Sequence, residues 1–150
     1  MTPPKQAQQV LPHSPGGIAV NFLSRYSEPF YALFRIIAGL LFAGHGAMKL
    51  FGLLGGHRMG EPLMKVAGVI ECFGGLLIAL GLLTPIVAII ACGEMAVAYF
   101  TVHAKMPPSP FSPWENKGEL AVLYCFIFLY IAAHGSGGWS VDSLIRKGRR

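Results

Sequence analysis

Charged side chains interrupt the long apolar stretches of this 150-residue chain. Lys49 lies in the first stretch, Glu71 in the second and Glu94 in the third. A charge at the centre of a bilayer costs roughly 2.5–3.5 kcal/mol on insertion scales, whereas a Leu or Ile returns only about 0.3–0.6 kcal/mol. Such groups are tolerated when they face one another, so they indicate either ion pairs that hold helices together or a functional site.

The candidate site combines these groups with others at similar depth. Counted at 1.5 Å per residue from the ends of their helices, Lys49 and Glu71 match within one turn and are the best candidate ion pair. Arg35 stands apart as a charge on the inner side, close enough to the surface for its side chain to snorkel into water. The predicted polar cluster in the outer half of the bundle comprises His45, Lys49, Glu71, Glu94, His103 and Glu119.

Three kinds of chemistry fit such a cluster. The charges can pair only to specify one helix arrangement, as buried ion pairs sometimes do. They can instead bind a ligand or quinone, or carry protons, because intramembrane ionisable residues mark functional sites by default. Carboxylates and histidines also occur in metal centres of helical bundles, but the Glu-x-x-His spacing of those centres is absent from every apolar stretch, so no metal site is predicted.

The elements that position these residues are expected to be transmembrane helices. Crossing about 30 Å of hydrocarbon takes roughly 20 apolar residues in a helix. Four stretches meet that need, which predicts an all-α, antiparallel bundle of four transmembrane helices. We expect the glycines of the first two helices to let these helices approach closely. They are Gly39, Gly44, Gly46, Gly68, Gly74, Gly75 and Gly81. The predicted spans are residues 30–54, 64–83, 85–104 and 118–134.

Composition excludes the main soluble alternatives. The chain is 53% hydrophobic and only 13% charged, which leaves too little polar surface for a globule in water. Its net charge of +5 resides in tails and loop edges, so we expect contact with the lipid bilayer and no nucleic-acid partner. The three cysteines form no Cys-x-x-Cys pair, and we expect no structural disulfide. The proline-rich connection 105–117 is either an ordered interfacial cap or a mobile loop.

Charge distribution predicts the topology. The basic tail 145–150 and Arg25 outweigh the positive charges of the two opposite connections, so the positive-inside rule places both termini in the cytoplasm. The expected organisation is a polar N-terminal tail over residues 1–29, a four-helix transmembrane domain over 30–144 and the basic cytoplasmic tail. The expected location is the bacterial inner (plasma) membrane, where the protein crosses several times.

A series of short motifs follows in fixed order from Phe34 to about Leu144. With these motifs the chain resembles the DoxX family of small four-span bacterial membrane proteins. The motifs are Arg35-x-x-x-Gly39, His45-Gly46-x-x-Lys49-Leu50-Phe51-Gly52, Glu71-x-x-Gly74-Gly75, Leu80-Gly81-Leu82-x-Thr84, Asn116-Lys117-Gly118-Glu119 and Gly135-x-Gly137-x-x-Ser140-x-Asp142.

The resemblance implies a membrane subunit associated with a quinone-linked or other redox complex. His45, Glu71 and Glu94 could exchange protons with a quinone. The chain carries no haem or flavin motif, so we expect no cofactor of its own, and any oxidoreductase activity would need a redox partner protein. A homo-oligomer is also compatible with the sequence. The alternative hypothesis is a non-catalytic membrane scaffold or a carrier of a small solute.

Overall fold

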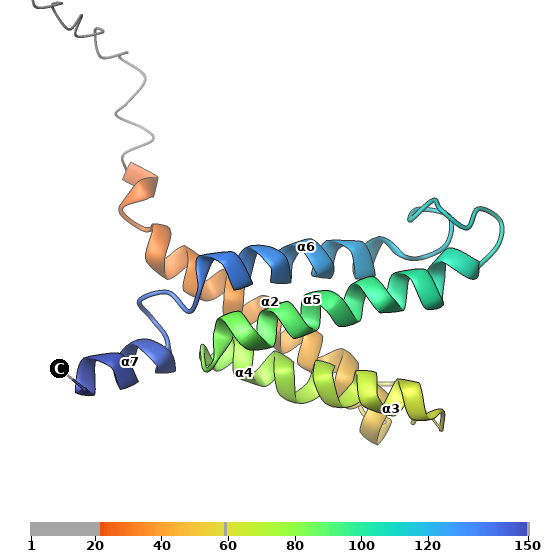
Figure 1. The fold of residues 1–150 in the computed structure, drawn as a ribbon, viewed down its shortest axis with the longest axis horizontal. Coiled ribbons are helices and arrows are strands. Elements are labelled where there is room, and N and C mark those ends of the chain that lie inside the picture. The colour runs from red at the N-terminus through yellow and green to blue at the C-terminus, as the bar shows by residue number, and fades with distance from the viewer. Residues whose placement is uncertain (1–21, 59, 150) are drawn as a thin grey trace, which may run out of the picture.

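The computed structural model describes residues 22–58 and 60–149, and in these ranges all the regular structure is helical (Figure 1). Three consecutive helical segments form one continuous rod, which we call the second rod. They are α3 (Pro62–Val69), the π-helix η1 (Ile70–Gly74) and α4 (Gly75–Leu80). The remaining helices are α2 (Ser27–Phe51), α5 (Thr84–Thr101), the short 3-10 helix η2 (His103–Lys105), α6 (Glu119–His134) and α7 (Val141–Gly148).

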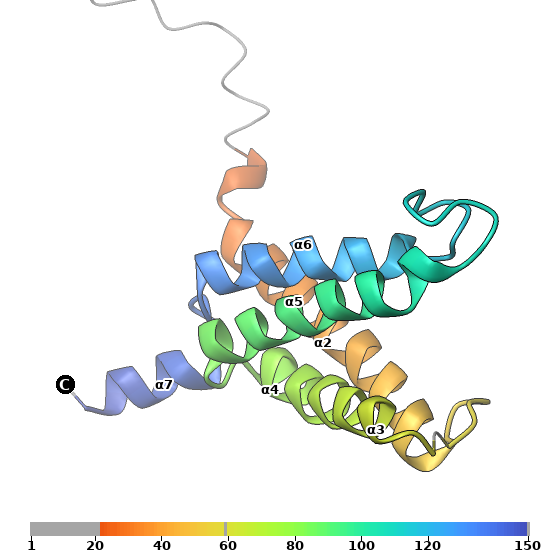
Figure 2. The same ribbon diagram turned by 45° about the vertical axis from the view of Figure 1, so that its right-hand side comes forward.

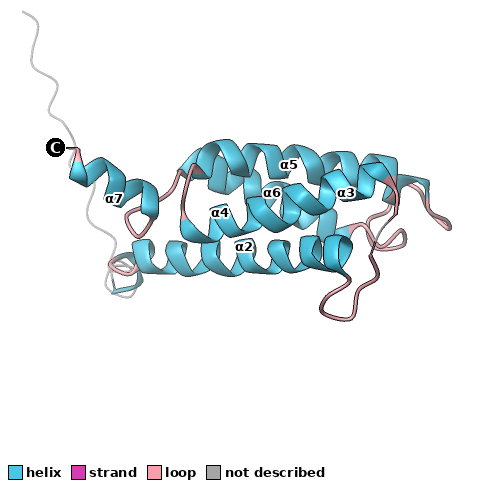
Figure 3. Cartoon of the chain, turned by 90° about the horizontal axis from the view of Figure 1, so that it is seen from below, coloured by secondary structure: helices cyan, strands magenta, loops and turns pink. Residues whose placement is uncertain are grey.

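Four helical rods lie side by side as an elongated bundle, and α7 extends beyond it (Figures 1 and 3). The α2–α3 and α5–α6 connections lie together at one end, which we call the loop end. The start of α2, the α4–α5 turn and α7 lie at the opposite end, the terminal end (Figure 2). The antiparallel helices therefore hold Lys49 of α2 and Glu71 of η1 toward the loop end.

The bundle exposes apolar side chains on its outside. Leu41, Ile86 and Phe126 are each 60% exposed or more, the opposite of the pattern of a protein dissolved in water. Three rods are long and apolar enough to cross a membrane: Ser27–Phe51, Pro62–Leu80 and Thr84–Lys105. The fourth, α6, has 16 residues and spans roughly 24 Å at 1.5 Å per residue. These helices together fit a helical membrane bundle.

Glycines let α2 and the second rod pack backbone against backbone, as the sequence predicted. A Cβ atom on Gly39 would lie 2.5 Å from the carbonyl oxygen of Gly75, and one on Gly75 would lie 2.5 Å from the amide nitrogen of Ala43. A Cβ atom on Gly46 would overlap the backbone of Cys72. In lipid, such close packing is a main source of helix association. This interface fixes α2 against η1.

Gly75→Ala tests this interface. Because the atoms that the new methyl group meets are backbone, they cannot turn aside, and we expect a loss of stability of about 1–3 kcal/mol. The matched control is Gly93→Ala in α5, where a Cβ atom meets nothing within 4 Å. Thermal unfolding of both variants in nanodiscs measures the difference. Equal midpoints for the two variants would contradict the glycine interface.

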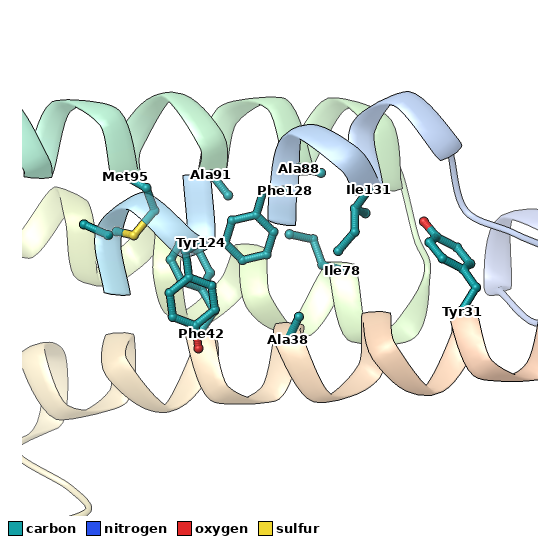
Figure 4. Packing of buried hydrophobic residues seen from close by; sticks show 11 residues of the cluster. Tyr31, Ala38, Phe42, Ile78, Ala88, Ala91, Met95, Tyr124, Phe128 and Ile131 are labelled. Carbon is teal, nitrogen blue, oxygen red and sulfur yellow. The ribbon is translucent and has the colours of Figure 1, made fainter. Parts of the chain in front are cut away.

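The interior is apolar and centred on aromatic rings (Figure 4). Phe42 of α2 meets Phe128 of α6 edge to face, with ring centroids 4.6 Å apart. Tyr124 stacks on Phe128 at 5.4 Å. From α5 the fully buried Ala88 and Ala91 and the buried Met95 reach this region. The core lies between the two ends and separates their polar groups.

Arg35 is buried at the terminal end, so the predicted snorkelling is wrong. Only 1% of the residue is exposed, and its guanidinium donates to the carbonyl oxygens of Ile78, of Ala79 at 2.9 Å and of Trp139 at 2.8 Å. The last carbonyls of a helix lack partners and carry partial negative charge, which favours a cation there. Arg35 therefore caps the end of α4 and ties it to the segment before α7.

Asp142 completes the terminal end by capping α5. Its carboxylate accepts hydrogen bonds from the backbone N–H groups of Leu83 at 3.0 Å and Thr84 at 3.2 Å. Its own N–H donates to the carbonyl oxygen of Gly81 at 3.0 Å. The side chain belongs to α7, whose start is capped by Ser140. The predicted boundary between residues 144 and 145 therefore falls inside α7, a helix that the sequence analysis did not predict.

The α5–α6 connection is folded around one buried residue, which favours the ordered cap over the mobile loop. Asn116 is fully buried, and its side-chain amide donates to the Pro110 carbonyl at 2.8 Å and accepts from the Gly118 N–H at 2.9 Å. These bonds satisfy backbone groups that would otherwise be unpaired in the loop. The connection is thus an ordered loop at the ends of α5 and α6.

Candidate functional site

A cavity of about 240 Å³ opens among α2, η1, α5 and α6 at the loop end. Its apolar wall includes Phe42, Met95 and Ala121. The polar groups on the cavity come from four different segments of the chain. They are His45, Lys49, Glu71, His103 and Lys117. Four of the six residues of the predicted cluster therefore surround one space.

The predicted pair of Lys49 and Glu71 is confirmed. The Lys49 Nζ lies 2.6 Å from Glu71 Oε1, with side-chain exposures of 23% and 3%. A buried ion pair must recover a large desolvation cost through its geometry and its further hydrogen bonds. The second carboxylate oxygen, Glu71 Oε2, is buried without a hydrogen-bond partner among the described residues. This oxygen is available to a ligand, a water molecule or a proton.

The carboxylate is carried by a π-helical turn inside the second rod. In η1 the hydrogen bonds reach one residue further than in an α-helix, a distortion that is often found at functional sites. Glu71 and Cys72, which are adjacent in the chain, are both buried there. Their burial follows from the close approach of Gly46, which brings α2 against this turn.

The two histidines lie at different walls of the cavity. His45 meets Tyr124 edge to face, with ring centroids 6.2 Å apart. His103 Nδ1 lies 3.1 Å from the carbonyl oxygen of Asn116. Since a carbonyl oxygen only accepts, Nδ1 of His103 carries the proton of this hydrogen bond. In the neutral ring, Nε2 is then free to accept a proton.

Glu94 and Glu119 do not border this cavity. Glu94 lines an adjoining hollow between α3 and α5, which also contains Lys49, and its Oε2 is buried with no hydrogen-bond partner in the described chain. Lys49 therefore lies at the junction of the two spaces. Glu119 is exposed in the first turn of α6, where a carboxylate is favoured by the helix dipole. Arg35 lies at the terminal end, away from the cavity.

Sequence reasoning missed three contributors to the site. Tyr124 is 5% exposed and forms a cavity wall. Lys117, at the end of the α5–α6 connection, also borders the cavity. Asn116 orders the α5–α6 connection, and its backbone carbonyl oxygen accepts a hydrogen bond from the ring of His103. The signal was present in the Asn116-Lys117-Gly118 motif, which places a polar segment directly before the last apolar stretch.

Apolar grooves flank the polar cavity on its lipid side. One groove, of about 250 Å³ between α2 and α6, shares Leu120 and Tyr124 with the cavity. The hollow next to α3, of about 240 Å³, shares Lys49 and Ala98 with it. A polar head group in the cavity would thus adjoin apolar surface for a hydrocarbon tail. Within residues 22–58 and 60–149, no group of three or more possible metal ligands is present.

Lys49→Met is expected to destabilise the bundle by about 3 kcal/mol, because it leaves the Glu71 carboxylate buried and unpaired. The double variant Lys49→Met/Glu71→Leu is expected to recover most of this loss, because it removes both desolvation costs. Unfolding midpoints in nanodiscs measure both effects, with the exposed Lys65→Met as the control. Additive losses in the double variant would contradict an energetic coupling of the pair.

The long apolar helices, the glycine interface and a charged cavity within the bundle define a small helical membrane protein. The particular family follows from sequence comparison: the DoxX family matches residues 30–104, which include α2 from Phe30 onward, the second rod and α5. The chain belongs to the DoxX family, as its motifs had indicated.

Two relatives extend this similarity over most of the chain. An uncharacterized protein of Haemophilus influenzae is 40% identical over 129 residues, covering 83% of this chain and 96% of its own length. The Bacillus subtilis protein named "putative oxidoreductase CatD" is 29% identical over 124 residues, covering 79% of this chain and 88% of its own. No solved structure matches the chain significantly.

Proposed function

We propose that this protein is a four-span membrane subunit of a redox complex, and that it exchanges protons with a quinone in the loop-end cavity. The observation that carries this proposal is the unpartnered, buried Oε2 of Glu71 in a cavity with His45 and His103. Quinone reduction consumes protons, so a quinone site needs groups of this kind near its carbonyl oxygens.

The size and surroundings of the cavity support a quinone head group as the ligand. At about 240 Å³ the cavity is smaller than the roughly 300–1,000 Å³ of pockets for drug-sized ligands. A single ring fits this scale, and the groove between α2 and α6 offers apolar surface for an isoprenoid tail. The ion pair of Lys49 and Glu71 would keep the carboxylate oriented toward the ring.

The proposed topology places both termini in the cytoplasm and the cavity in the outer half of the bacterial inner membrane. Arg146 and Lys147 lie on α7 at the terminal end and Arg149 directly follows it, and this concentration of positive charge supports that orientation. The basic end would also contact anionic lipid head groups. In this orientation the quinone site faces the outer surface.

A redox partner protein completes the proposal, because the chain has no redox cofactor motif that could supply electrons. The name of the Bacillus subtilis relative supports an oxidoreductase association. The second candidate is a membrane scaffold or small-solute carrier, and the ion pair itself favours it, since the pair can serve only to fix helix arrangement. Bound quinone distinguishes the two candidates.

The test is to purify the full chain from quinone-containing membranes in mild detergent and to quantify extracted quinone by chromatography. We expect bound quinone in the wild type and an affinity at least about tenfold lower in Ala98→Phe, which is a loss of roughly 1.4 kcal/mol. Ala98 lines the cavity, so a phenyl group there occupies the space of the ring.

Ala133→Phe, at an exposed position of α6, is the matched control and is expected to retain the quinone. Crosslinking in native membranes before the same purification would identify the redox partner. A wild-type protein that carries no quinone and binds none when it is supplied would overturn the quinone site and favour the scaffold.

A further inference from the structure

Two of the three cysteines meet across the α5–α6 interface. Cys92 Sγ lies 3.6 Å from Cys125 Sγ, although the residues are 33 positions apart in the chain. Both thiols are free. A disulfide has an S–S distance of about 2.05 Å, so a closing movement of about 1.5 Å would join the two sulfur atoms. The cavity described above includes neither residue.

Helix geometry places the pair at the edge of the interface. Cys92 follows the fully buried Ala91, and Cys125 follows the buried Tyr124, so each thiol is turned by about 100° from a core-facing position. Both cysteines are only partly buried, whereas Cys72 is buried against α2. The pair is accessible from the lipid side, and the third cysteine is not.

The depth of the pair restricts what can react with it. Cys92 lies eight residues after the start of α5 and nine before its end, and Cys125 lies nine residues before the end of α6. Exposed Ile89 and Leu129 flank them one helical turn away. Charged glutathione cannot reach such a position, and a thiolate is disfavoured in hydrocarbon. A suitable oxidant must be lipid-soluble and must take up protons together with electrons.

We infer that Cys92 and Cys125 form a redox-active dithiol that membrane quinones oxidise to an interhelical disulfide. In this step the two S–H bonds break and one S–S bond forms. Two electrons and two protons pass to the quinone, whose carbonyl oxygens become the hydroxyl groups of the quinol. No net charge is left in the hydrocarbon. The disulfide would join α5 to α6 near mid-helix.

This inference goes beyond the proposed function, because it requires a quinone in the bilayer but no quinone in the cavity. A covalent link between α5 and α6 would fix the helices that form two walls of the cavity. The presence or absence of the disulfide would thereby depend on how oxidised the membrane quinones are.

The experiment uses the full chain in nanodiscs, reduced and then incubated without oxygen with tetramethyl-1,4-benzoquinone. The fully substituted ring of this quinone disfavours addition of a thiol to carbon. Free thiols are then alkylated under denaturing conditions and counted by intact mass. We expect the count to fall from three to one, with one quinol formed per chain and the new bond between the peptides of Cys92 and Cys125.

Matched variants complete the test. Cys72→Ser is expected to lose both of its remaining thiols, whereas Cys125→Ser is expected to keep both. Ala98→Phe is expected to form the disulfide normally, so failure of the cavity proposal and failure of this one are distinguishable. Three thiols surviving in the wild type, a disulfide between two chains, or a mass gain of one quinone per thiol would each overturn the inference.

Discussion

The close approach of α2 to the second helical rod is the constraint on which both polar ends of the bundle depend. Gly39 and Gly75 allow the two backbones to meet, and Gly46 continues the contact at η1. In lipid there is no hydrophobic force to drive these helices together, so the absence of side chains between them matters energetically. The same interface brings Lys49 to Glu71 at one end and Arg35 to the carbonyls of α4 at the other.

The DoxX motifs, dispersed along the sequence, gather into two groups in space. Arg35, Gly81 and Asp142 meet at the terminal end, where they satisfy the backbone groups of helix ends. His45, Lys49 and Glu71 meet at the loop end, where Glu71 Oε2 and Glu94 Oε2 have no hydrogen-bond partner among the described residues. The first group makes its hydrogen bonds to the backbone of helix ends and is structural, although Arg35 Nε is buried without a partner among the described residues. The second leaves a carboxylate oxygen of Glu71 unused beside a cavity, which is the property expected of a site.

The sequence was sufficient to predict the helices and the central ion pair, because apolar length sets the span and helical rise sets the depth. It was not sufficient to predict that Arg35 is buried, since depth alone does not reveal the unsatisfied carbonyls that a guanidinium can cap. Depth also fails to distinguish opposite faces of α5. The sequence therefore could not show that Glu94 borders a neighbouring hollow instead of the cavity. Tyr124 needed the packing of α6 to be recognised as a wall.

The cysteines also show that the sequence alone does not reveal which residues meet between helices. Their spacing in the chain predicts no dithiol, yet antiparallel packing of α5 and α6 brings Cys92 and Cys125 together. Pairings of this kind depend on the register of two helices, which neither hydropathy nor local motifs determine. Register is therefore the quantity that a sequence of short apolar helices leaves open.

The unequal lengths of α2 and α6 have a consequence for the surrounding lipid. With 25 and 16 residues, the two helices measure roughly 37 and 24 Å, against a hydrocarbon thickness of about 30 Å. In a four-span arrangement, α2 has to tilt while acyl chains beside α6 have to shorten or splay. The membrane would thus be thinned on the flank where the groove between α2 and α6 opens. Lipid deformation at that flank favours the approach of molecules that pack poorly among ordered acyl chains.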